Sequence, residues 1–262
     1  MKMPCISIIT ICFNSVKTIE ETILSILGQH YPNLDYVIID GGSSDGTLDI
    51  IRKYKDCLGY YCSEPDKGIS DAFNKGITHA KGNIIGIINS DDILLPDALK
   101  NVAEAYDETT DIYRGNTIVV NPDTGFRGRE VPSMHFPLAP KVIHVAHQGT
   151  FITKNAYQKW GVYNVNFKYM MDFDLITRMY RNGAKMKQVN YDIAEFRIGG
   201  ISLTPLYKKK YDIKHVVIDN GGSQLRANLY YSYMWSFDLA KRIFVSFFGI
   251  DRLKKLHYHR NK

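Results

Sequence analysis

Residues 84–92 read IIGIINSDD, an apolar run that is followed at once by polar and acidic residues. The run at 84–88 contains no polar side chain, which is typical of a strand buried on both faces of a sheet. The segment NSDD at 89–92 therefore follows the carboxyl end of a buried strand. In open α/β sheets ligands bind at that end of the strands, so polar motifs in this position are candidates for function.

The chain upstream of 84–92 repeats this alternation of apolar runs and amphipathic stretches. The pattern predicts strands at 6–11 and 36–39, and helices at 15–27, 48–54 and 69–77. We interpret Ser15 as the N-cap of the first helix, while Pro96 and Asp97 open a helix downstream. This β-α-β-α order predicts an α/β protein with a mostly parallel central sheet flanked by helices.

The second half of the chain has a different character. The pattern predicts a hairpin at 113–131, a strand at 147–153 and a helix at 173–181. Beyond residue 205 the pattern is mostly helical. We therefore divide the chain into one α/β domain at 1–205 and a helical, basic extension at 206–262.

Composition indicates a folded protein in a reducing compartment. Apolar residues make up 45% of the chain, which argues against disorder. The four cysteines show no C-x-x-C spacing, so zinc and a disulfide framework are both disfavoured, and reduced thiols suit the cytoplasm. The N-terminus lacks a signal-peptide cleavage site, and the apolar run at 243–250 is too short to cross a bilayer.

The net charge of +6 is concentrated at the C-terminus. Residues 241–262 contain seven Lys or Arg and one acid, Asp251, and seven minus one equals the charge of the whole chain. The first 240 residues are near neutral, which argues against a nucleic-acid partner. Residues 223–256 are rich in leucine and aromatic side chains beside these cations, a composition that suits peripheral contact with the inner face of the cytoplasmic membrane. Packing on the core or a homodimer seam would need the same apolar face.

Asp91 and Asp92 are the strongest candidates for metal binding. Two adjacent carboxylates repel each other unless a cation is present, and Mg²⁺ or Mn²⁺ prefers oxygen ligands and keeps positions open for phosphate. A metal that bridges two phosphates neutralises the charge that grows on a leaving diphosphate. The alternative interpretation is that either aspartate simply caps a turn.

Two loops further upstream carry polar residues in similar positions. Asp40 ends the predicted strand at 36–39 and precedes GGSSDG, where an acid can accept hydrogen bonds from a base or ribose. The second loop, at 63–76, carries Asp66, Lys67 and Asp71 before or within a helix, and Lys67 could meet a phosphate. An ordinary turn and a solvated helix start are the alternatives. No G-x-G-x-x-G or Walker A motif is present, which argues against nicotinamide cofactors and P-loop chemistry.

Four segments, in this order and spacing, resemble the family 2 glycosyltransferases. They are ITICFN (9–14), IIDGGSSDGT (38–47), EPDKGISDAFNKG (64–76) and NSDD (89–92). The resemblance covers roughly residues 4–205 and is greatest to the branch found in bacterial O-antigen, capsule and exopolysaccharide clusters. It implies a GT-A nucleotide-diphosphosugar transferase fold, a Mn²⁺ or Mg²⁺ cofactor and a UDP-linked donor.

The resemblance also assigns roles on the donor side. Asp91 and Asp92 stand where the family has its metal-binding acids, and Asp40 stands at the position that contacts the nucleobase. Thr10 and Asn14 lie on the first strand-end loop, which lines the donor. We also expect donor contacts from Asp66, Lys67, Asp71, Gly199 and Gly200. The last two belong to FRIGGIS (196–202), which resembles a loop that closes over the donor, where Arg197 could assist; a plain β-turn is the alternative.

The family needs a base for the acceptor hydroxyl, and related sequences place an aspartate at the start of a helix. Here that segment reads MMDFDLITRM (170–179), which makes Asp172 the candidate base. Met171 replaces the usual preceding acid. Alternatively, Asp172 is an N-cap and Asp174–Arg178 a surface ion pair. His147 and Gln148 occupy a place that lines the acceptor side in similar sequences, although a lone histidine is often structural.

These assignments together predict an inverting glycosyltransferase. Its acceptor would be a saccharide or a polyprenyl-diphosphate-linked glycan. Two alternatives remain: a catalytically inactive nucleotide-sugar-binding assembly subunit, suggested by Met171, and a sugar nucleotidyltransferase. The latter needs an N-terminal glycine-rich loop, and ITICFNSVKT contains no glycine.

Overall fold

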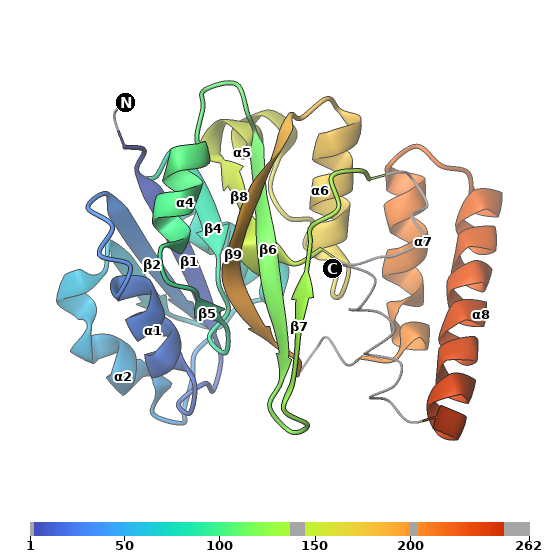
Figure 1. Cartoon of the computed structure of the whole chain (residues 1–262), viewed down its shortest axis with the longest axis horizontal. Coiled ribbons are helices and arrows are strands. Elements are labelled where there is room, and N and C mark those ends of the chain that lie inside the picture. The colour runs from blue at the N-terminus through green and yellow to red at the C-terminus, as the bar shows by residue number, and fades with distance from the viewer. Residues whose placement is uncertain (1–2, 137–144, 200–203, 249–262) are drawn as a thin grey trace.

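The computed structural model describes residues 3–136, 145–199 and 204–248. Its strands form one sheet in the order β3-β2-β1-β4-β8-β6-β9-β5, with β7 paired to β6 (Figure 1). Their bounds are β1 Ile6–Cys12, β2 Leu34–Asp40, β3 Tyr60–Ser63, β4 Ile84–Ile87, β5 Ile93–Leu94, β6 Ile112–Asn121, β7 Phe126–Glu130, β8 Thr150–Thr153 and β9 Met186–Arg197.

The sheet is mostly parallel, as the sequence predicted. Strands β1 to β4 pair in parallel, and β6 and β9 run in the same direction as these four. Only β5, β7 and β8 run the other way among the described strands. All the carboxyl ends of β1, β2 and β4 therefore lie at one edge, where the candidate motifs begin.

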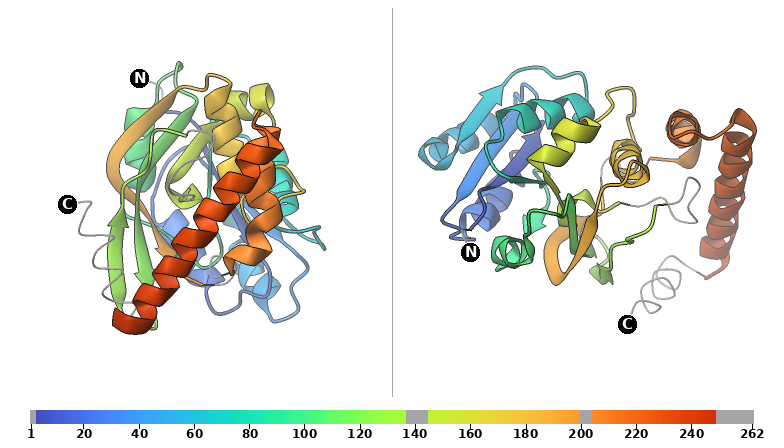
Figure 2. Two further views of the ribbon diagram at one scale, coloured as in Figure 1. Left: turned by 90° about the vertical axis from the view of Figure 1, so that its right-hand side faces the viewer. Right: turned by 90° about the horizontal axis from the view of Figure 1, so that it is seen from above.

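Helices cover both faces of the sheet (Figure 2). They are α1 Ile19–Leu27, α2 Thr47–Lys53, α3 Ile69–His79, α4 Ala98–Ala105, α5 Lys154–Trp160, α6 Met171–Arg181, α7 Lys210–Asp219 and α8 Gln224–Phe248, with short 3₁₀ turns η1 Lys55–Cys57, η2 His147–Gly149 and η4 Leu206–Lys209. Neighbouring side chains of β1 point to opposite faces. Ile8 packs in the core under α1, α2 and α4, whereas Ile9 packs in the core with α3, α5 and α6.

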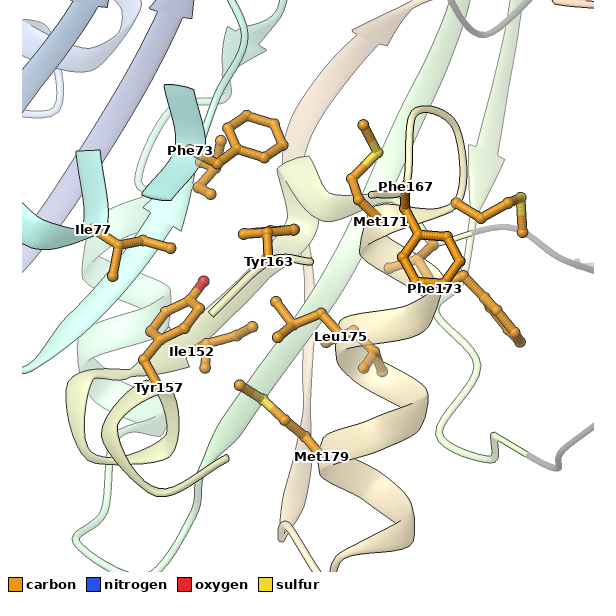
Figure 3. Packing of buried hydrophobic residues seen from close by; sticks show 14 of the residues in the cluster. Phe73, Ile77, Ile152, Tyr157, Tyr163, Phe167, Met171, Phe173, Leu175 and Met179 are labelled. Carbon is orange, nitrogen blue, oxygen red and sulfur yellow. The ribbon is translucent and has the colours of Figure 1, made fainter. Parts of the chain in front are cut away.

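The second of these cores extends into the C-terminal helices. Figure 3 shows three residues of this core: Tyr157 of α5, Tyr163 from the segment between α5 and α6, and Leu175 of α6. Val216 of α7 and Ala227 of α8 are also buried there. Helices α7 and α8 lie side by side beyond α6 (Figure 1). The expected boundary at 205/206 stays a prediction.

Most predicted elements are present, and several were missed. Ser15 is not an N-cap, because α1 begins only at Ile19 and the Ser15 carbonyl instead accepts hydrogen bonds from the amides of Thr18 and Ile19. The segment predicted as a strand at 147–153 starts with η2, and only 150–153 is extended. Strands β3, β5 and β9 and helix α5 were not predicted. Within the described residues, no helix has the length and apolarity needed to span a membrane.

Candidate active site

The first strand-end loop is held against the second. Asn14, directly after β1, adopts a left-handed conformation with φ of 50°. Its side-chain oxygen accepts a hydrogen bond from the amide of Ser44 at 3.0 Å, and its own amide donates to the Ser43 hydroxyl at 2.8 Å. Asparagine tolerates this conformation better than most residues. The predicted residue Asn14 therefore lies at the edge of the sheet, beside the loop that follows Asp40.

Asp40 lies at this edge but is completely buried. Its carboxylate accepts hydrogen bonds from the Ser63 hydroxyl at 2.5 Å and from the Ser43 amide at 3.1 Å, and also from the Ser43 hydroxyl. The aspartate thus joins the loop after β2 to the end of β3. Any contact with a ligand would come first from the more exposed serines.

Thr10 does not reach the edge, which corrects the expectation that it lines the donor. It lies within β1, is fully buried, and its hydroxyl is 3.1 Å from that of Tyr36. The sequence reading missed Phe13 instead. This large apolar side chain is 63% exposed and lies beside Gly41, where an added Cβ would be 3.4 Å from its ring. An exposed aromatic directly after a buried strand was the signal that could have identified it.

The loop at 64–71 lies beside Gly41. A Cβ at Gly41 would lie 2.7 Å from Asp66 Oδ2, so the absence of a side chain at residue 41 leaves room for the Asp66 carboxylate in its present position. Asp66 accepts a hydrogen bond from the Gly68 amide at 2.8 Å, and Asp71 accepts one from the Lys67 amide at 3.0 Å. Both carboxylates therefore shape the loop, while the Lys67 side chain is exposed.

Asp91 and Asp92 lie after β4 but have different environments. Asp92 is fully buried; its carboxylate accepts hydrogen bonds from Gln148 Nε2 at 2.8 Å and from the Arg197 amide at 3.1 Å. Burial, and then the neighbouring Asp91 charge, raise the pKa of Asp92 to about 7. Asp91 is partly exposed, and no side chain of the described residues hydrogen-bonds its carboxylate. Burial raises the pKa of Asp91 as well.

The chemistry of these groups fits a divalent cation. Among the described residues, no three His, Cys, Asp or Glu side chains are gathered as a complete ligand set. However, among the residues that the structure describes, the Asp91 carboxylate has no hydrogen-bonding side-chain partner, and the nearby buried Asn89 Oδ1 has no partner. Mg²⁺ and Mn²⁺ take oxygen ligands and often only one or two carboxylates from the protein. Asp91 therefore offers the more accessible carboxylate of the pair, and metal binding by Asp91 and Asp92 stays a prediction.

Asp172 lies in the first turn of α6 and does not cap the helix. The helix has no side-chain cap, and Asp172 instead places Oδ2 3.0 Å from His147 Nδ1. The other carboxylate oxygen, Oδ1, is buried and has no partner within the described residues. Burial lowers the pKa of His147, but Asp172, Asp92 and Asp91 outweigh it, so that the pKa of His147 is raised. The predicted residues His147, Asp172, Asp91 and Asp92 are thus electrostatic neighbours.

Two neighbours of Asp172 differ from the sequence interpretation. Asp174 was expected in a surface pair but is only 2% exposed, with Arg178 Nη2 3.6 Å from its carboxylate. Burial raises the pKa of Asp174. Met171, which replaces the usual acid, is buried in the core with α6 (Figure 3). Met171 therefore contributes apolar packing next to Asp172.

The end of β9 lies against Asp92 and α1. Besides the bond from its amide to Asp92, Arg197 donates from its side chain to Glu21 of α1 at 2.8 Å. Gly199 follows two residues later and is partly exposed. Residues 200–202 of the loop expected at 196–202, Gly200 among them, lie outside the described residues.

Comparisons with known proteins agree with this architecture. The model of the family "Glycosyl transferase family 2" matches residues 7–179. The chain is 32% identical over 181 residues to the uncharacterised glycosyltransferase Rv1514c of Mycobacterium tuberculosis, covering 67% of this chain and 68% of that protein.

Two solved structures share the fold. Staphylococcus aureus TarS 1–349 in complex with UDP-GlcNAc has a TM-score of 0.67 at 18% identity, covering 86% of this chain and 70% of TarS. The mannosyltransferase PcManGT from Pyrobaculum calidifontis, in complex with GDP-Man and Mn²⁺, has a TM-score of 0.64 at 17% identity, covering 93% and 74%. At these identities the likeness concerns the GT-A fold alone.

Proposed function

Because the chain belongs to glycosyl transferase family 2 and is a glycosyltransferase that uses nucleotide-sugar donors, we propose that it is a metal-dependent, inverting enzyme with a UDP-linked donor. The observation that carries this proposal is that two adjacent residues link the acids: His147 Nδ1 lies 3.0 Å from Asp172 Oδ2, and Gln148 Nε2 donates to Asp92, next to Asp91, at 2.8 Å. Asp91 and Asp92 suit a metal-bound diphosphate, and Asp172 suits an acceptor hydroxyl.

Asp172 is the base in this proposal. The acceptor hydroxyl gives its proton to the Asp172 carboxylate while its oxygen forms a bond to the anomeric carbon. The bond from that carbon to the diphosphate oxygen breaks, and its electron pair leaves with the nucleoside diphosphate. Attack opposite the leaving group inverts the anomeric configuration. The contact with His147 supports this role, because it fixes the position of the Asp172 carboxylate.

The donor side positions the nucleotide. A bound divalent cation would neutralise charge on the diphosphate, and Asp91 would hold it. Phe13 offers an exposed aromatic face on which a nucleobase can stack, next to the serines that bond Asp40. Asn14, Asp66 and Asp71 keep the loops around that position in shape. Lys67 and Gly199 remain proposed contacts for phosphate.

Calorimetric titration with UDP, GDP and a nicotinamide dinucleotide, each with Mn²⁺ and with EDTA, tests the donor and metal assignments. We expect UDP to bind in Mn²⁺ and to lose most of its affinity in EDTA. If GDP bound and UDP did not, the donor would be a GDP-linked sugar in place of a UDP-linked one. Binding of no nucleotide would favour the inactive assembly subunit, and binding of the dinucleotide would contradict the proposal.

The acceptor assignment rests on α8, which is apolar on two opposite faces. One face packs on α7 through Ala227 and Tyr230. The other is exposed and carries a row of large apolar side chains at helical spacing: Leu225, Leu229, Leu239, Ile243 and Phe247, between 41% and 79% exposed. An exposed stripe of this kind next to cations suits the surface of an anionic membrane.

The charge of the tail favours lipid over a second copy of the chain. Residues 241–262 carry six net positive charges in sequence, although 249–262 lie outside the described residues. Two such tails would repel each other, whereas an anionic membrane attracts them. A polyprenyl-diphosphate-linked acceptor is presented at such a surface, so we propose peripheral membrane contact and a lipid-linked glycan acceptor.

Co-sedimentation with phosphatidylglycerol and phosphatidylcholine vesicles tests this contact. We expect binding to the anionic vesicles only, and loss of binding in the double variant Leu229→Glu/Ile243→Glu. Val165→Glu is a matched control, because Val165 is 56% exposed but lies far along the chain from α8. Unchanged vesicle binding by the double variant, or a dimer that it disrupts, would contradict the lipid assignment.

A further inference from the structure

We propose that η2 is a positioning element that sets the base relative to the donor carboxylates, with His147 holding Asp172 and Gln148 holding Asp92. These adjacent residues point their polar groups at two different carboxylates: His147 Nδ1 at Asp172 Oδ2, 3.0 Å away, and Gln148 Nε2 at Asp92 Oδ2, 2.8 Å away. This inference rests on the proposed function, because it requires Asp172 to act as base and Asp92 to support the donor.

The turn itself is fixed to the sheet. Gly149 lies so close to β6 that an added Cβ would be 2.7 Å from both the Gly115 carbonyl and Thr117 Oγ1. Thr150 then ties the turn from the other side, because its hydroxyl donates to the Ala146 carbonyl at 2.9 Å and accepts from Arg114 Nε at 3.2 Å. Because the turn is held at both ends, the side chains of His147 and Gln148 stay at a fixed distance from each other.

The His147 ring is confined by packing on its other sides. The Phe73 ring lies against it, with ring centroids 5.7 Å apart. A small cavity of about 10 Å³, room for roughly one water molecule, is lined by His147, Asp172, Tyr157 and Tyr163, among others. The imidazole therefore has little freedom to turn away from Asp172.

Stability alone does not account for a histidine at this position. His147 Nε2 is buried and has no partner within the described residues. A buried polar atom left unpaired opposes folding, so an apolar residue of similar size would pack more favourably. The gain that offsets this cost is the bond from Nδ1 to Asp172. A carboxylate misplaced by about 1 Å can lose on the order of 100-fold in rate.

Two isosteric variants separate positioning from packing. His147→Asn places an amide nitrogen where Nδ1 lies, whereas His147→Gln places one where Nε2 lies. We expect His147→Gln to lower kcat for nucleotide release from UDP-glucose or UDP-GlcNAc, with water as acceptor, by about 10- to 100-fold. His147→Asn should retain most of kcat. Calorimetric affinity for UDP with Mn²⁺ should be unchanged in both.

Gln148→Ala, in the same turn, should lower the affinity for UDP, which the His147 variants leave unchanged. The variant removes the hydrogen bond that Gln148 donates to Asp92. We therefore expect UDP affinity in Mn²⁺ to fall by about 10- to 100-fold, the range typical of residues that support metal ligands. Equal losses of kcat in His147→Asn and His147→Gln, or an unchanged UDP affinity in Gln148→Ala, would overturn the proposal.

A measurement that needs no turnover keeps this inference separate from the proposed function. The ¹H–¹⁵N NMR spectrum of the His147 ring, assigned by its loss in His147→Asn, should show a hydrogen-bonded Nδ1–H that changes in Asp172→Ala. Unchanged ring signals in Asp172→Ala would overturn the pairing. If the wild type releases nucleotide from no donor while the ring signals do change, the proposed function fails and the pairing stands.

Discussion

The proposed donor side and the proposed base side of the site are built from different kinds of contact. At the proposed donor side, Asp40 ends β2 and Asn14 follows β1 by two residues, and they bond to serines of the loop after β2 and of β3. At the base side, Asp172 depends on η2 for a partner and on α7 for its place in space. Asp212 of α7 accepts hydrogen bonds from three successive backbone amides just before α6, at 2.6–3.1 Å.

This difference predicts that donor binding and sugar transfer respond differently to substitutions in the two regions. Parallel strands bring their loops together whatever the C-terminal helices do, so donor binding should survive damage to α7. The base has no such support from the sheet, because the segment before α6 is fixed by a carboxylate more than 40 residues further along the chain. Variants of the two regions should therefore separate binding from transfer, and the following predictions test that separation.

Asp172→Asn should give the largest effect. An amide cannot accept the proton, and general bases contribute about 10²- to 10⁴-fold to rate, so transfer should fall by that factor. UDP affinity in Mn²⁺ should stay within about twofold, measured by calorimetry. Near-normal nucleotide release from a UDP-sugar would mean that the base lies elsewhere.

Asp212→Ala should damage the base side without touching the reacting groups. It leaves three amides without their charged acceptor, and one such bond contributes about 1.5–3 kcal/mol, so we expect a loss of roughly 3 kcal/mol in the free energy of unfolding in urea. Transfer should fall more than UDP affinity does. Asp123→Ala, in the exposed β6–β7 turn, is the control. Equal losses of both properties would show that the two sides are not independent.

Asp91→Asn should damage only the donor side. The amide is a weaker metal ligand than the carboxylate, so UDP affinity in Mn²⁺ should fall by at least about 10-fold, with little change in EDTA. Because Asp91 has no hydrogen-bonding side-chain partner within the described residues, the unfolding free energy should change little. A matched exposed variant, Asp56→Asn, should change neither quantity.

Glu21→Gln should give the smallest effect. Its ion pair with Arg197 is short, at 2.8 Å, but the Glu21 side chain is 59% exposed, and such pairs contribute about 0–1 kcal/mol. Urea unfolding should change by less than about 1 kcal/mol. A change in UDP affinity of more than about 10-fold would instead mean that Arg197 acts on the donor and that Glu21 controls it.

The sequence by itself determined the parallel half of the sheet and the location of the acids. Buried strands of this kind are continuous apolar runs, and the loops that follow them are local, so Asn14, Asp40 and Asp91 could be assigned to one edge. Strand β9 escaped prediction because it is half exposed and carries polar residues along most of its length. Its pairing with β6 depends on partners about 75 residues away.

Only the tertiary structure decided which member of each polar group is exposed and which is covered. Asp91 and Asp92 are adjacent, yet Asp92 alone is covered, by Gln148 and Arg197 from more than 50 and 100 residues away. The pairing of His147 with Asp172 likewise arises where η2 meets α6. A pattern of residue types specifies the elements that form, but burial and hydrogen-bond partners depend on which elements pack together.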